Sequence, residues 1–412
     1  MKTLIENGKV FIDNKLTEIN MLIENGKITA RDCKEFSADR VLDVKGNYIL
    51  PGAVDAHAHL TYPEGEETFY TGTCAAAAGG YTTVVDMNHP SSCTTKEDYV
   101  EKKEECSSQA VVDFGLCSGI AIEEEDLQEL AELKSLGTPY LKLFMPLQPD
   151  YDYIYRTLVA CKEAGIIPGI HAEDMQLIDH FSRNMNWQQA VSFVNSRPPV
   201  TEEMATAAIL ELARTAGTPV HFCHTSSAET AVIIKTAREE RGIRATTEIQ
   251  PHYLILDDSY FSTLGPYVKT TPPIRNRETK KLLWKQLQQG DIDFISSDHF
   301  YCPQQKKEEG QADIRRAPGG IPGIEHGFSL LYHYGVEAGK ISLARLVELM
   351  SEKPARFCGM YPRKGSLKTS TDADFIIFDP EKEWTIRGEE MLSAAGYTPY
   401  EGWKIKGKVM KT

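Results

Sequence analysis

The chain has 412 residues, of which 41% are hydrophobic and 25% are charged, and its formal net charge is -14. Because a single hydrophobic core stops growing near about 250 to 300 residues, this length predicts one large domain and a smaller one. The composition excludes a long disordered tract. A strongly acidic chain with only short lysine pairs, such as Lys306-Lys307, also argues against nucleic acid or an anionic membrane as a partner.

The cysteines and the N-terminal residues indicate the compartment. Nine cysteines are scattered between Cys33 and Cys358 without a CxxC pair, so neither a disulfide framework nor a thiolate zinc site is indicated. The first residues, MKTLIENGKV, carry charges and lack the apolar segment of a signal peptide, and no apolar run reaches the length of a membrane span. We therefore expect a cytoplasmic protein with no membrane segment.

The two ends of the chain share a pattern of short alternating apolar segments. Near the start, the segments LIENGKVFI, MLIENGKI and VLDVKGNYIL contain Asn-Gly or Lys-Gly and predict β-hairpins. Near the end, DADFIIFDP and GWKIKGKV show the same pattern of short apolar segments. We expect residues 1–50 and 358–412 to form one composite β-sandwich domain.

Between residues 51 and 357, eight β-rich runs alternate with helical patterns. The runs are ILPGAVDAH, YTTVVDM, VVDFGLC, YLKLFM, IPGIH, PVHFCH, ATTEIQ and IDFISSD. Two clear helical stretches are residues 201–216, with Thr201 as the expected N-cap, and residues 279–289. Eight parallel strands with helices between them predict an α/β protein with a closed (β/α)8 TIM barrel.

An open doubly wound sheet is the alternative for the same alternation. It would normally carry a Gly-rich phosphate-binding turn after the first strand, and no such turn is present in the sequence. Gly79-Gly80 precedes a strand and is more simply the end of the helix that includes residues 75–78. The closed barrel is therefore preferred.

Several chemistry-bearing side chains fall at the C-terminal ends of the predicted barrel strands, the face where active sites of this fold lie. They are His57, Lys142, His171, His224 and Asp298. Side chains alternate along a strand, so His57 and His59 project to the same side and could share one metal ion. Two partly exposed histidines on a strand edge are the alternative explanation of this pair.

Lys142 interrupts an otherwise apolar strand. A buried ammonium costs several kcal/mol unless it is paired, so Lys142 needs either an acid such as Asp298 or a chemical change. His171 and His224, each considered alone, are more typical of satisfied core histidines than of metal ligands. A carboxylate at Asp298 can both bind a metal and move a proton, and a set of nitrogen and oxygen ligands favours zinc.

This ordered set resembles the amidohydrolase superfamily, in particular its cyclic amidase branch of dihydroorotase, allantoinase and hydantoinase/dihydropyrimidinase. The motifs that carry the resemblance span nearly the whole chain: PGAVDAHAHL, AAAAGGYTTVVDM, YLKLFM, HAED, PHYL, SSDH, APGGIPGIE and TPYEGWKIKGKV. The resemblance implies a metal-dependent hydrolase that opens a small cyclic amide or ureide, and a homodimer or homotetramer.

The resemblance also implies a site with two Zn²⁺ per subunit, bridged by a carboxylated Lys142 and a hydroxide. His57, His59, the Lys142 carbamate and Asp298 would hold one metal. The carbamate, His171 and His224 would hold the other. Asp298 would act as the catalytic acid and base that moves a proton to the departing ring nitrogen.

The substrate is indicated by departures from the family patterns. Dihydroorotase-like chains hold the substrate carboxylate with an arginine and with an MPNT turn. This chain has Thr61 in place of that arginine, and residues 87–90, MNHP, in place of that turn. Loss of the arginine favours a substrate with a neutral ring. The stretches DMNHPSSCTT, SSDHFYCP, GGIPG, FDPEKEWT and TPYEG look closest to allantoinase, which favours a hydantoin-type ring. Residues 60–65, LTYPEG, depart from the allantoinase pattern. Dihydroorotase or dihydropyrimidinase activity, and a non-catalytic dihydropyrimidinase-like scaffold, are the alternatives.

Further side chains are candidates for supporting roles. The expected substrate contacts are Thr61, His89, Cys302, Pro318, Gly319 and Gly320. His252 and His299 are expected to orient metal ligands. The remaining histidines are interpreted as structural: His180, His221, His326 and His333.

Overall fold

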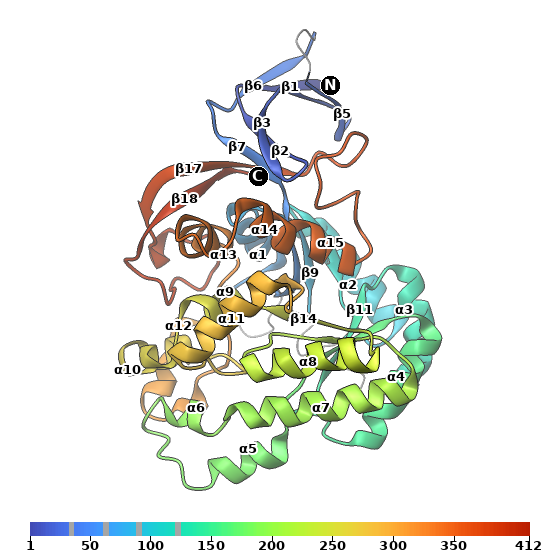
Figure 1. Cartoon of the computed structure of the whole chain (residues 1–412), viewed down its shortest axis with the longest axis vertical. Coiled ribbons are helices and arrows are strands. Elements are labelled where there is room, and N and C mark those ends of the chain that lie inside the picture. The colour runs from blue at the N-terminus through green and yellow to red at the C-terminus, as the bar shows by residue number, and fades with distance from the viewer. Residues whose placement is uncertain (33–36, 61–65, 88–92, 120–124) are drawn as a thin grey trace.

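The computed structural model describes residues 1–32, 37–60, 66–87, 93–119 and 125–412. The chain forms a small part made of strands at one end and a larger part of strands surrounded by helices (Figure 1). The N-terminus and the last two strands both lie at the small end, although they come from opposite ends of the sequence (Figure 1).

Two sheets make up the small part, and residues from both chain ends contribute to them. One sheet has the order β5-β4-β1-β6 and the other β18-β17-β7-β2-β3. The strands are Lys2–Glu6 (β1), Lys9–Ile12 (β2), Lys15–Glu18 (β3), Met21–Glu24 (β4), Lys27–Arg31 (β5), Arg40–Asp43 (β6), Tyr48–Pro51 (β7), Phe375–Thr385 (β17) and Lys404–Lys411 (β18). Buried aliphatic side chains fill the space between them, including Ile5, Val10, Met21, Ile28, Ile49 and Ile377.

Only one of the three expected hairpins is present. Asn25-Gly26, with φ of 51° and 72°, joins the antiparallel neighbours β4 and β5, as a turn with two positive φ values should. The hairpin prediction is wrong for LIENGKVFI and VLDVKGNYIL, because β1 and β2, like β6 and β7, belong to different sheets. In both cases the turn carries the chain from one sheet to the other.

Eight parallel strands form the barrel, and all eight β-rich runs of the sequence contribute one. They are Ala53–His59 (β8), Tyr81–Asp86 (β9), Asp113–Leu116 (β10), Tyr140–Phe144 (β11), Ile167–His171 (β12), Val220–Phe222 (β13), Ala245–Ile249 (β14) and Phe294–Ile295 (β15). The short strand His299–Phe300 (β16) pairs parallel with β8, and the amide of Lys142 donates to the carbonyl of Ser118 at 3.0 Å, so the ring closes. The prediction of a (β/α)8 barrel is confirmed.

Helices follow the barrel strands and cover their outer face. The longer ones are Phe69–Ala78 (α1), Lys96–Gln109 (α2), Leu130–Leu136 (α3), Tyr151–Ala164 (α4), Met175–Ser182 (α5), Pro199–Ala216 (α7), Ala228–Arg241 (α8) and Arg277–Gln289 (α11). Short helices fill the later connections: Ser192–Asn195 (α6), Pro251–Ile255 (α9), Phe261–Leu264 (α10), Gln304–Glu308 (α12), Gly327–Leu331 (α13), Leu343–Val347 (α14) and Lys353–Phe357 (α15). No helix in the described ranges is long and apolar enough to cross a membrane.

The helix expected from Thr201 starts earlier than the sequence pattern suggested. Its N-cap is Pro198, Pro199 occupies the first turn, and the hydroxyl of Thr201 donates to the carbonyl of Pro198 at 2.9 Å. The N-cap prediction for Thr201 is therefore wrong, because a proline in the first turn satisfies the helix start without a side-chain cap. The other helix begins at Arg277, with the side chain of Asn276 accepting from the amide of Thr279.

One buried lysine joins the two parts of the molecule. The Nζ of Lys364 lies 2.9 Å from a carboxylate oxygen of Asp372 and 2.6 Å from one of Asp374, next to β17, and it also contacts Asp113 on barrel strand β10. Lys364 is 3% exposed. Burial opposes the charge, but the hydrogen bonds of the three carboxylates outweigh it and raise the pKa of Lys364.

Candidate metal centre

The six side chains singled out from the sequence meet at the C-terminal mouth of the barrel. His57 and His59 lie on β8, Lys142 lies on β11, and His171 ends β12. His224 lies shortly after β13, and Asp298 lies shortly after β15. Five of the six line one cavity of about 280 Å³, and His57, which is fully buried, lies beneath it.

Three of these side chains converge on a single point. Oδ1 of Asp298 lies 3.3 Å from Nε2 of His57 and 3.4 Å from Nε2 of His59. Burial alone would raise the pKa of Asp298, but the two imidazoles outweigh it and lower that pKa to about 2. Two nitrogens and one carboxylate oxygen within 4.8 Å of one another are the donors that a zinc-like cation requires.

His171 and His224 form a second group on the neighbouring strands. Nδ1 of His171 lies 2.9 Å from Nε2 of His224, and the ring centroids are 4.5 Å apart. Burial lowers the pKa of both imidazoles, so both are neutral at physiological pH. A neutral imidazole is the form that binds a metal.

Lys142 lies between the two groups of histidines. It is 6% exposed, and its Nζ is 3.4 Å from Nε2 of His57. Among the residues that the structure describes, no carboxylate forms an ion pair with Lys142, so the expected alternative of a Lys142–Asp298 pair is not found. A buried ammonium surrounded by imidazoles is unfavourable by several kcal/mol, whereas a negatively charged carbamate at the same place would suit two adjacent cations.

Glu248, on β14, supports the first group and was missed in the sequence. Its carboxylate contacts Nδ1 of His57, lies 3.7 Å from Nε2 of His221, and accepts from the amide of His224 at 3.3 Å. Glu248 is fully buried. The only signal in the sequence was an acidic residue within the strand ATTEI, and His221, interpreted as structural, belongs to the same network.

Glu173 supports the second group in the same way. Its Oε2 lies 2.7 Å from Nε2 of His171 and accepts from Nη1 of Arg197 at 2.6 Å. Burial alone would raise the pKa of Glu173, but Arg197 and the hydrogen bond from His171 lower it to about 2. Glu173 therefore stays ionised and turns Nδ1 of His171 toward His224.

The backbone is strained at two of the six positions. His224 has a φ of 38° and Asp298 a φ of 46°, values that non-glycine residues rarely adopt and that cost about 1 to 3 kcal/mol each. Fully buried Asp55 accepts from the amides of His57 and Ser297 at 3.1 and 3.0 Å, which ties β8 to the segment that follows β15. The fold keeps this strain where the six side chains meet.

Above these side chains, the cavity wall is mostly apolar. It is formed by Phe144, Leu147, Thr270, Thr271, Phe300 and residues 318–320. Gly320 has a φ of 135°, and a Cβ there would lie 2.5 Å from the ring of Phe300, so only glycine fits. Nζ of the buried Lys307 donates to the carbonyls of Pro318 and Gly320 at 2.9 and 2.7 Å and fixes this part of the wall.

The expected substrate contacts fall into three groups. Pro318, Gly319 and Gly320 line the cavity. Cys302 is buried, its thiol is directed toward the carbonyl of Pro303, and it is not part of the described lining. Thr61 and His89 lie outside the described residues.

Of the two expected orienting histidines, His299 makes a polar contact and His252 packs against an aromatic ring. Nε2 of His299 lies 2.9 Å from Oε2 of Glu67. His252 is buried with its ring centroid 4.3 Å from that of Tyr253, and burial lowers its pKa to about 4.

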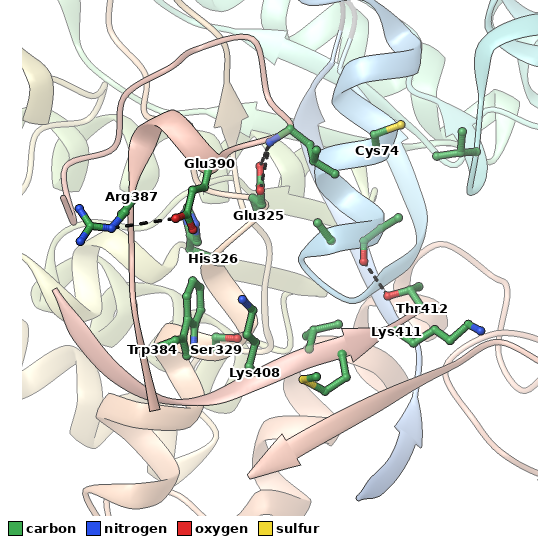
Figure 2. Close-up of a pocket in the computed structure, with 16 residues that line it drawn as sticks. Cys74, Glu325, His326, Ser329, Trp384, Arg387, Glu390, Lys408, Lys411 and Thr412 are labelled. Carbon is green, nitrogen blue, oxygen red and sulfur yellow. Dashed lines mark hydrogen bonds and ion pairs between the residues drawn. The ribbon is translucent and has the colours of Figure 1, made fainter. Parts of the chain in front are cut away.

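Other clusters and cavities do not match the chemistry of this site. The carboxylates of Asp113, Asp372 and Asp374 lie close enough to hold a cation, but the ammonium of Lys364 already occupies the space between them. A larger cavity of about 520 Å³ lies between α1, the start of α13 and strands β17 and β18, where Trp384, Lys408 and His326 face it (Figure 2). None of the six side chains lines that cavity.

Fold and site thus define a barrel protein with the side chains of a metal centre at its mouth. Residues 48–412 match the model of the amidohydrolase family. A D-hydantoinase from Geobacillus stearothermophilus is 33% identical over 99% of this chain and 90% of its own length, and a dihydroorotase from Methanosarcina mazei is 34% identical over 97% and 90%. An allantoinase from Salmonella newport is 30% identical over 99% and 93%.

The structure comparison agrees with the sequence comparison. The L-hydantoinase (dihydropyrimidinase) from Arthrobacter aurescens has a TM-score of 0.93 at 29% identity, with 99% of this chain and 93% of that chain covered. The chain belongs to the amidohydrolase family, in its cyclic amidase branch. The relatives differ by only a few per cent in identity, so the expected closeness to allantoinase in particular does not stand out.

Proposed function

We propose that this chain hydrolyses the amide bond of a small, neutral cyclic ureide, with a hydantoin-type five-membered ring as its first substrate class. One observation carries the choice of a neutral ring: within the described cavity wall, Lys142 is the only lysine or arginine. The sequence of residues 61–65, 88–92 and 120–124 contains neither residue type. A carboxylate-bearing ring such as dihydroorotate would lack the cationic partner that a buried carboxylate requires.

The donor set supports a site for two metal ions. His57, His59, Asp298 and a carboxylated Lys142 would hold one Zn²⁺, and the carboxylated Lys142 with His171 and His224 would hold the other. When bound, the zinc ions supply Lewis acidity, which lowers the pKa of water toward neutrality and polarises the substrate carbonyl.

The residues of the chain then have separate tasks. Asp298 accepts a proton and returns it to the departing ring nitrogen, because its carboxylate faces the cavity from the floor. Glu248 and Glu173 keep His57 and His171 in the orientation needed for binding. Phe144, Leu147 and Phe300 exclude water and contact the faces of a small ring.

The apolar wall also ranks substrates within the hydantoin class. A ring with no substituent or an apolar one would bury its substituent against Phe144, Leu147 and Phe300. The ureido group of allantoin would need polar partners, and Thr270 and Thr271 are the polar side chains that the described wall offers apart from the candidate metal ligands. Hydantoin therefore ranks before allantoin. A six-membered dihydropyrimidine ring is the second candidate, because the same apolar contacts would accept it.

We also propose the division of the chain that its pattern suggested. Residues 1–50 and 358–412 would form the composite β-sandwich domain, and residues 51–357 the hydrolase barrel. The pairing of β7 with β17, which includes Ile49 opposite Ile377, supports this division.

A substrate panel tests the function. The zinc-loaded protein is incubated with hydantoin, allantoin, dihydrouracil and dihydroorotate, and the loss of ring amide absorbance is followed. The Lys142→Ala variant, prepared in parallel, controls for a contaminating hydrolase. Turnover of hydantoin or allantoin above the other two rings is expected. Activity on dihydroorotate alone would contradict the neutral-ring assignment, and a metal-binding protein inactive on every ring would favour the scaffold.

A further inference from the structure

A third cavity, of about 390 Å³, is rich in cations, and its lining residue Arg197 contacts Glu173, the partner of His171. It is bounded by α5, the start of α6 and residues 314–316, which pack against α6. In Figure 1 this region lies at the end of the molecule away from the β-sheets of the small part. The side chains that matter here are Arg183, Trp187, Phe193, Arg197, Lys269 and Arg315.

Lys269 supplies a buried positive charge to this cavity. It is 6% exposed, and its Nζ donates to the carbonyls of Ile314 and Arg315 at 2.8 and 3.2 Å. Within the described ranges, no carboxylate forms an ion pair with it. Burial, together with the charge of Arg197, lowers the pKa of Lys269 to about 8. Nζ also donates to the carbonyl of Ala317 and lies 4.8 Å from the ring centroid of Phe193, so the ammonium is held in place by neutral groups. Asp313 is the acidic group that acts on its charge, and an anion in the cavity would stabilise that charge further.

Arg197 has hydrogen-bonding capacity left over. Its Nη1 donates to Glu173 at 2.6 Å, and its guanidinium lies 5.3 Å from the ring of Phe193. In the described part of the chain, neither Nε nor Nη2 has a hydrogen-bond partner. A planar guanidinium with one edge in use can still offer donors to an oxyanion from its other edge.

The rim adds two arginines and a flat apolar surface. The guanidinium of Arg315 lies 5.1 Å from the ring of Trp187 and is paired with Asp313. Arg183 is exposed, and no carboxylate of the described residues forms an ion pair with it. The lining thus holds four cations and one carboxylate, Asp179, although the chain as a whole is strongly acidic. Two of the four cations are also paired with carboxylates outside the lining, Arg197 with Glu173 and Arg315 with Asp313.

We propose that this pocket binds a phosphate group, free or carried by a small molecule, between Arg183, Arg197 and Arg315. A phosphate suits the arrangement better than a carboxylate, because its oxygens can accept from donors that approach from several directions. Trp187 offers a surface for the organic part of a phosphate ester, and the cavity volume is in the range of small-molecule sites. The site is distinct from the metal centre, since the two cavities share no lining residue.

Calorimetric titration of the zinc-loaded protein with inorganic phosphate, adenosine 5′-monophosphate and adenosine tests this proposal. Inorganic phosphate or the nucleotide should bind, whereas adenosine should not. Tryptophan emission should change on binding in the parent protein and stay constant in the Trp187→Phe variant. The two phosphate compounds separate a free phosphate from an ester: comparable affinity indicates the anion alone, and tighter nucleotide binding indicates an ester.

Matched variants show where the anion binds. Arg183→Gln and Arg315→Gln change exposed side chains and should each weaken binding about tenfold, the usual effect of losing one charge-assisted contact. The control is Arg214→Gln, which changes an exposed arginine on α7 that is paired with Glu211. This variant should leave the affinity for phosphate unchanged. Equal binding in all three variants would overturn the proposal, because the anion would then be held elsewhere, for instance at the zinc ions. Absence of binding to the parent protein would overturn it as well.

Discussion

The carboxylate of Glu248 contacts Nδ1 of His57, and both side chains are fully buried. Because one nitrogen of the imidazole is occupied in this way, the other points toward Asp298. We expect Glu248→Gln to weaken metal binding about 10- to 100-fold, the usual effect of losing a partner that orients a ligand. Metal analysis after dialysis against a weak chelator measures this effect. Glu239→Gln, on the exposed side of α8, is the control, and equal metal retention in both variants would show that Glu248 has no orienting role.

Lys142 is the second residue whose substitution tests the metal centre. Lys142→Ala should lose metal and activity together, because no other described side chain lies where the carbamate would bridge the two groups of histidines. Short carboxylic acids added with zinc should restore part of the activity by supplying the missing oxygens. Lys235→Ala, which removes a half-buried lysine paired with Asp291 far from the six side chains, is the control. Full activity of unrescued Lys142→Ala would remove this residue from the site.

Asp298 should separate metal binding from turnover. Asp298→Asn keeps an oxygen ligand but loses the proton acceptor, so we expect most of the metal to remain and turnover to fall about 10²- to 10⁴-fold. Metal content and initial rates are measured on the same preparation, with Asp291→Asn as the control. A near-normal rate would assign the proton transfer to another group.

Lys307 should make stability depend on pH. Burial, with the charge of nearby Lys269 adding to it, lowers its pKa to about 7, against about 10.4 in an unfolded chain. Below pH 7, Lys307 is protonated in both the folded and the unfolded protein. Between pH 7 and about 10, Lys307 is protonated only in the unfolded protein. The free energy of unfolding should therefore rise with pH in this window, by up to about 1.4 kcal/mol per unit.

The Lys307→Met variant isolates this contribution, because its free energy of unfolding should lack that part of the slope. Denaturant unfolding at pH 6.5, 8 and 9.5 gives the slopes for both proteins. Identical slopes would show that Lys307 keeps its proton in the folded state, stabilised by the carbonyls of Lys269, Pro318 and Gly320.

The sequence was informative about the barrel because two periodic patterns repeat along it. Each apolar run of four to eight residues predicts a buried strand, and alternation within DAHAH places His57 and His59 on one side. Polar residues at strand ends then had to meet at one mouth, and the structure brings all six together.

Partners across the fold could not be predicted in the same way. Glu248 and Arg197 look like ordinary charged residues in the sequence, and only the packed structure shows that they lie behind His57 and Glu173. Similarly, Asn-Gly and Lys-Gly predict where the chain turns, but not which strand pairs with which. For this reason LIENGKVFI joins two different sheets, whereas MLIENGKI forms a hairpin.

The sheet that both chain ends share has a consequence for synthesis on the ribosome. Strand β7 pairs with β2 on one edge. On its other edge it pairs with β17, which lies more than 300 residues later in the chain. Before β17 has been synthesised, this edge of β7 is unpaired. An unpaired apolar strand edge can associate with other chains. Pairing with β17 therefore covers this edge only after the C-terminal part of the chain has been synthesised.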